Sequence, residues 1–65
     1  MTQVYMRHIR AALLCSRGTR GFFRRHGLDW GRFLAEGIPA EKLSATGDAM
    51  ALRVVAIAEY ERGQG

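Results

Sequence analysis

Few residues in this chain have side chains suited to covalent chemistry. A nucleophile and its base could come only from the single cysteine, Cys15, with His8 or His26. Because Cys15 follows the apolar run 11–14, we expect it to be a small core residue rather than a nucleophile. One cysteine and two distant histidines are also too few ligands for a metal ion. The sequence therefore predicts no catalytic residue, no metal site and no cofactor.

The acidic residues also argue against an enzyme. Asp29 and Asp48 each precede a segment of helical character, where an aspartate caps the free N–H groups of the first turn. Their use as caps leaves no spare pair of carboxylates for acid–base catalysis. We expect His26 to be a partly buried or capping residue. No enzymatic activity and no small-molecule substrate are predicted.

Charge is distributed unevenly along the chain. Residues 1–28 contain six arginines and no acid, whereas residues 29–65 contain four bases and six acids. Such asymmetry indicates that the N-terminal half meets an anionic surface, although a merely solvated basic face would show the same pattern. Arginine suits the first interpretation because its forked guanidinium binds phosphate and carboxylate groups.

The arginines gather on one predicted helix, residues 16–26. At 100° per residue, Arg17, Arg20 and Arg24 lie within about 60° of one another, opposite Phe22 and Phe23. We expect this stripe to be exposed and to have no acidic partner within the chain. The candidate anion- or partner-binding residues are Arg17, Arg20, Arg24 and Arg25.

Short helices must position these residues. Capping residues and glycine stops predict helices at about 7–14, 16–26, 30–36, 39–43 and 49–61, with Ser16, Asp29 and Asp48 as N-caps, Pro39 as a first helical residue, and Gly27 and Gly37 as stops. No strand is predicted, although residues 2–5 are compatible with an extended or frayed start. The fold expected is all-α, a compact orthogonal bundle of about five short helices. It forms a single domain over residues 1–65, with loose ends at 1–6 and 62–65.

The last predicted helix should be central. Residues 49–61 are apolar around most of the helix circumference, as in a helix that others surround. The predicted core is Phe22, Trp30, Phe33, Leu34, Leu52 and Val55. Gly18 and Gly21 each weaken their helix by about 1 kcal/mol relative to alanine, and we attribute them to close approach of another backbone.

Several classes of partner follow from these patterns. No apolar run approaches the roughly 20 residues of a membrane helix, so no membrane partner is expected. An arginine stripe on a short helix is compatible with a helix-turn-helix-like protein whose Arg17, Arg20 and Arg24 contact phosphates. Only Ser16 and Thr19 are then placed to read a base edge. The spacing of Trp30, Phe33-Leu34, Gly37-Ile38, Leu43, Gly47 and Val54-Val55 is loosely similar to sterile-alpha-motif domains, five-helix bundles that mostly bind proteins and often self-associate.

A second resemblance spans roughly residues 7–57. It rests on Leu14-Cys15-Ser16-Arg17-Gly18, Phe22-Phe23-Arg24-Arg25-His26-Gly27-Leu28-Asp29-Trp30, Phe33-Leu34-Ala35-Glu36-Gly37-Ile38-Pro39 and Ala45-Thr46-Gly47-Asp48-Ala49. These segments resemble a family of small proteins of tailed bacteriophages and prophages of proteobacteria, which has no assigned chemistry. The resemblance implies a protein of the host bacterial cytoplasm or of the virion.

Two functions are compatible with these observations. The first is a non-enzymatic phage-encoded interaction protein, a virion accessory or an assembly factor, that binds a protein partner or itself through its basic face. The second is a small nucleic-acid-binding protein that uses the same arginines. The two functions differ in the anion that contacts Arg17, Arg20 and Arg24, which is an acidic protein patch in the first and a nucleic-acid phosphate in the second.

Overall fold

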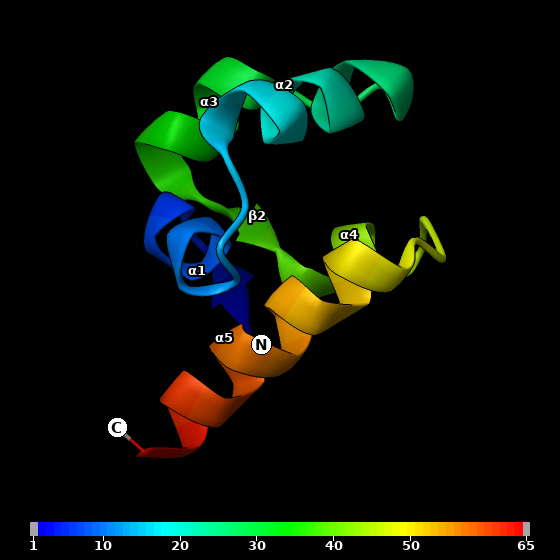
Figure 1. Cartoon of the computed structure of the whole chain (residues 1–65). Helices are drawn as coiled ribbons and strands as arrows, with labels where there is room; N and C mark the ends of the chain where they lie inside the picture. Colours follow the sequence, from blue (N-terminus) through cyan, green and yellow to red (C-terminus); the bar gives the residue numbers. More distant parts are fainter. Residues whose placement is uncertain (1, 65) are drawn as a thin grey trace.

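Seven elements follow one another in the computed structural model, which describes residues 2–64 (Figure 1). They are β1 (Gln3–Val4), α1 (Met6–Ala11), α2 (Ser16–Arg25), α3 (Trp30–Glu36), β2 (Ile38–Pro39), α4 (Ala40–Ser44) and α5 (Ala49–Gln64). The five short helices confirm the predicted fold class. In Figure 1, α2 and α3 lie on one side of the molecule and α4 and α5 on the other.

A small sheet was not predicted. β1 and β2 pair antiparallel, with Gln3 opposite Pro39 and Val4 opposite Ile38. The backbone N–H of Ala40 continues the ladder by donating to the Thr2 carbonyl oxygen over 2.9 Å. Two residues per strand are too few for a periodic pattern to reveal, and the sequence carries no hairpin signal because the strands are far apart in the chain.

Both ends are more ordered than predicted. The loose end expected at residues 1–6 is wrong for residues 2–6, because Val4 is completely buried and β1 is held by its ladder. At the other end, α5 continues through residues 62–64, and Arg62 Nη1 donates to Thr2 Oγ1 over 3.2 Å. Residues 1 and 65 of the predicted loose ends lie outside the described residues.

Side-chain caps begin three helices. Asp29 Oδ1 accepts from the Arg32 N–H and Asp48 Oδ2 from the Ala51 N–H, each over 2.9 Å, as predicted. The cap of α2 is Cys15 rather than Ser16, since its Sγ accepts from the Gly18 N–H at 3.3 Å. Cys15 is consequently exposed, and its predicted place in the core is wrong.

Pro39 has a different position from the one predicted. It precedes α4 as its N-cap residue, with ψ of 134°, instead of forming the first helical turn. The physical reason is its pairing opposite Gln3 in the sheet, which requires an extended backbone.

Four residues between positions 2 and 64 have a left-handed backbone: Leu13, Gly27, Gly37 and Gly47. Leu13 follows α1, where its N–H bonds to the Arg10 carbonyl and the next N–H, of Leu14, bonds to the Ile9 carbonyl. This is the Schellman ending of a helix, and the same pattern ends α2 at Gly27. At Gly37, φ is 84° and a β-carbon would lie 2.7 Å from ring carbons of Tyr5. Leu13 alone in this group bears a side chain, and 86% of its surface is exposed.

The core contains an aromatic cluster formed by α2 and α3. Phe23 lies edge-on to Trp30, with ring centroids 5.3 Å apart, and 4.8 Å from the centroid of Phe33. Phe33 is buried as predicted, whereas Leu34 is 55% exposed and was wrongly assigned to the core. The two are consecutive on α3, so 100° of rotation carries Leu34 away from the core. The other predicted core residues that pack against the core are half-buried: Phe22, Trp30 and Val55.

Helix α5 packs against α1, α4 and β1 along one stripe. Its buried residues are Ala51, Val54 and Ala58, whose spacing of three and four is that of one helix face. Leu52 is 46% exposed, so its predicted burial is also wrong. The helix therefore touches much of the fold without being surrounded, although its sequence is apolar nearly all round.

Candidate interaction surface on the second helix

The predicted arginine stripe lies on one exposed side of α2. Arg17, Arg20 and Arg24 are all exposed, and none of them takes part in an ion pair or side-chain hydrogen bond within residues 2–64. We call these three residues the arginine face. The structure thus brings them together as predicted, on a helix whose opposite side carries the buried Thr19 and Phe23.

The side of α2 turned away from the arginine face faces α5 across a cleft. Five residues line this cleft from α2, so Arg25 lies outside the arginine face: Gly18, Thr19, Phe22, Phe23 and Arg25. A β-carbon at Gly21 would lie 3.6 Å from Arg25 Nη1, which shows that the arginine folds back over this glycine. A β-carbon at Gly18 would lie 3.3 Å from Cys15 Sγ. The atoms nearest to the two glycines therefore belong to side chains, so the predicted close approach of another backbone is wrong.

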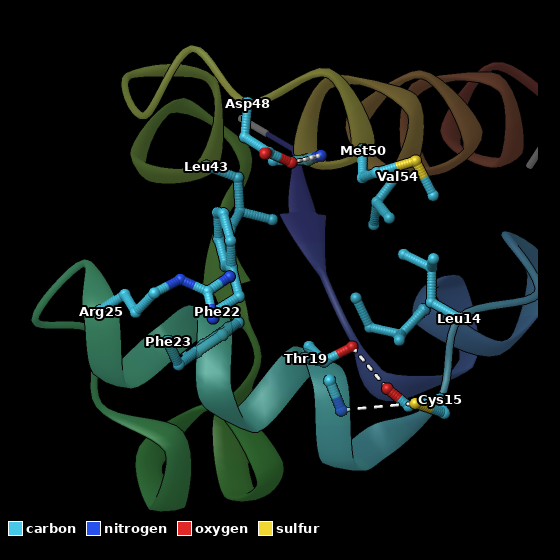
Figure 2. A pocket seen from close by; sticks show the side chains of 13 residues that line it. Leu14, Cys15, Thr19, Phe22, Phe23, Arg25, Leu43, Asp48, Met50 and Val54 are labelled. Atoms are coloured by element: carbon cyan, nitrogen blue, oxygen red, sulfur yellow. Dashed lines mark hydrogen bonds between the residues drawn. The ribbon is translucent and has the colours of Figure 1, made fainter.

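The cleft has a volume of about 220 Å³ and mostly apolar walls (Figure 2). Side chains from α1, α2, α4, α5 and the loop after α1 meet there: Ile9, Leu14, Phe22, Leu43, Met50 and Val54. Figure 2 shows Met50 and Val54 of α5 facing the α2 side of the cleft, with Leu14 beside them. No strong contact between α2 and α5 closes this space, because α2 packs mainly on α3.

Most of the polar side chains around the cleft have a role within the fold. Thr19 Oγ1 donates to the Cys15 carbonyl oxygen over 2.9 Å, Cys15 Sγ caps α2, and the Asp48 carboxylate caps α5. Arg25 makes no side-chain hydrogen bond or ion pair to residues 2–64. Its guanidinium, the one arginine side chain among the lining residues, therefore remains available to a ligand.

An ion pair between the two ends of the fold was not predicted. Arg7 of α1 holds Glu61 of α5 in a forked contact, with Nε donating to Oε2 over 3.3 Å and Nη2 donating to Oε1. The Arg7 guanidinium carbon also lies 4.8 Å from the centre of the Tyr5 ring. The hydrogen bonds from Arg7, with a smaller effect of His8, lower the pKa of Glu61 to about 2. Glu61 in turn raises the pKa of Arg7.

His8 lies under this ion pair and is only 2% exposed. Its Nδ1 accepts from the Tyr5 N–H over 2.8 Å, which completes one half of a capping box at the start of α1. A neutral imidazole that accepts at Nδ1 carries its proton on Nε2. That atom is 3.1 Å from Glu61 Oε1, at an angle too bent for a full hydrogen bond.

The cysteine and the two histidines lie in different surroundings and have different structural roles. Cys15 caps α2, His8 is buried against Glu61, and His26 is exposed at the end of α2, with its ring centroid 4.4 Å from that of Phe22. No group of three or more metal-ligating side chains occurs within residues 2–64. None of the helices in this described part is long and apolar enough to cross a membrane.

Comparison with known proteins adds no relative. No family model, curated protein or solved structure matches the chain.

Proposed function

We propose that this chain is a non-enzymatic interaction protein that binds an acidic segment of a partner protein through α2. The observation that supports this most directly is the arginine face: three exposed guanidinium groups on one helix, without an acidic partner within residues 2–64. Unpaired cations gathered on a rigid element attract an external anion and steer it to the surface. Forked contacts to carboxylates then orient it.

Two features favour a protein segment over a nucleic acid. Helix α2 also contributes Arg25 to an apolar cleft, which suits an apolar side chain better than a phosphate backbone. Of the two candidate base-reading residues, Thr19 is buried and its hydroxyl is bonded to Cys15. Only Ser16 remains for sequence readout, and a single hydroxyl distinguishes bases poorly.

A second copy of the chain is a poor partner because its acids are largely occupied. Four of the six acidic residues are used within the fold: Asp29, Glu36, Asp48 and Glu61. Association through α2 would therefore bring like charges together. The phage context, as a virion accessory or assembly factor, is part of this proposal and rests on the resemblance of residues 7–57.

Binding of defined probes tests the proposal. We expect a labelled peptide of alternating glutamate and serine to bind, and Arg17→Gln/Arg20→Gln/Arg24→Gln to weaken that binding by about tenfold or more. A matched control, Arg10→Gln/Lys42→Gln/Arg53→Gln, removes the same charge from exposed positions elsewhere. Equal losses for both variants would show that only net charge matters. The partner would instead be a nucleic acid if a short duplex DNA bound more tightly than the peptide. Its affinity should then fall steeply with salt, and the three α2 substitutions should reduce that salt dependence.

A further inference from the structure

The cleft between α2 and α5 has a size that restricts what enters it. Sites for whole small molecules have volumes of roughly 300–1,000 Å³, and this one has about 220 Å³. One large side chain of a partner fits that space better than a complete ligand. The wall formed by Phe22 and the flexible side chain of Met50 suit an aromatic ring.

Charge at the cleft restricts the occupant further. Arg25 lines the cleft, and its guanidinium has no side-chain partner among residues 2–64. The arginine face lies on the same helix, on the side turned away from Thr19 and Phe23, which also line the cleft. An occupant that brings an aromatic ring into the cleft therefore places a neighbouring residue beside the Arg25 guanidinium, where a carboxylate is favoured.

We infer that the cleft binds one phenylalanine-like side chain of an acidic partner segment, with an adjacent carboxylate held by Arg25. This inference rests on the proposed function, because it names the chemistry of the segment that the arginine face attracts. Specificity then comes from the apolar anchor, whereas the arginines supply attraction and orientation.

Two labelled peptides of equal length and charge test the anchor. One alternates glutamate and serine, and in the other a single central serine is replaced by phenylalanine. We expect the phenylalanine peptide to bind about tenfold more tightly, since burial of the ring is partly offset by the ordering of side chains. Arg25→Gln should reduce this preference.

Substitutions on α5 locate the effect. Met50→Trp should fill the cleft and abolish the preference, whereas Leu52→Trp should retain it. Met50 and Leu52 are two residues apart and similarly exposed, at 41% and 46%, but only Met50 lines the cleft. In the unaltered protein, the methyl NMR signals of Leu14, Leu43 and Val54 should shift when the phenylalanine peptide is added, and that of Leu34 should not.

The possible failures are distinct. If neither peptide binds, the proposed function itself is wrong. Equal affinity for the two peptides, with unshifted methyl signals in the cleft, would overturn the aromatic anchor and leave the acidic partner intact. Loss of the preference in Leu52→Trp as well would place the anchor's binding site elsewhere on α5.

Discussion

At the scale of single residues, Leu13 is in an unfavourable conformation. It occupies the left-handed position after α1, while Gly27, Gly37 and Gly47 occupy the other left-handed positions of residues 2–64. A side chain there strains the backbone by about 1–2 kcal/mol. Because Leu13 is 86% exposed, packing within the fold offsets little of that cost.

Leu13→Gly should therefore stabilise the protein. Relief of strain exceeds the greater freedom that glycine gives the unfolded chain, so we expect a gain of roughly 0.5–1 kcal/mol. The melting temperature, measured by thermal unfolding, should rise by about 4–8 °C for each kcal/mol gained in a domain of this size.

Leu34→Gly is the control, and we expect it to destabilise the protein. Leu34 is also exposed but lies inside α3, where glycine costs about 1 kcal/mol. A lower melting temperature for both variants would show that the left-handed position of Leu13 is not strained.

At the scale of elements, the ion pair between Arg7 and Glu61 holds the last turn of α5 against α1. The pKa of Glu61 falls to about 2 from an ordinary value of 4.5, chiefly because Arg7 donates to its carboxylate. A lowered pKa means that the folded state favours the ionised form. The stabilisation is thus complete above about pH 4.5 and is lost as the pH falls toward 2.

Glu61→Gln should remove this pH dependence. We expect the variant to be less stable than the unaltered protein at pH 6, and the difference to shrink as the pH falls from about 4.5 to about 2. Urea unfolding at several pH values measures it. Glu59→Gln, an exposed change on the same helix, should show no such convergence. A constant difference for Glu61→Gln over the whole range would contradict the ion pair.

Local elements were predictable from the sequence and distant pairings were not. Asp29, Asp48 and Gly27 act within their own turn, so their roles follow from neighbouring residues. Arg7 and Glu61 are 54 residues apart, and no pattern in either helix identifies the other. The arginine face was predictable because helix geometry alone sets it. The cleft depends on how α2 and α5 are placed relative to each other, which the sequence does not specify.

At the scale of the whole molecule, stability depends on a small aromatic core. Phe33 is almost fully buried and contacts both Phe23 and Trp30. Phe23 belongs to the last turn of α2, and Trp30 is the first residue of α3. Loss of the Phe33 ring would thus loosen two helices at once.

Phe33→Ala should cost about 3–5 kcal/mol, a large fraction of what a domain of this size possesses. We expect the variant to be largely unfolded at 37 °C by circular dichroism. Leu34→Ala, one residue away and exposed, should change stability by less than about 1 kcal/mol. A Phe33→Ala variant that melts like the unaltered protein would show that the aromatic cluster contributes little.

The contacts of Thr2 also determine the order in which the chain can fold during synthesis. The Thr2 carbonyl oxygen accepts from the Ala40 N–H, and the Thr2 hydroxyl accepts from Arg62. Both partners leave the ribosome long after Thr2. The α2–α3 pair, by contrast, has its aromatic contacts within a short stretch of chain and forms as soon as that stretch emerges. Residues 2–4 must therefore wait for β2, and the Thr2 hydroxyl for α5, whose contact closes the longest loop of the fold.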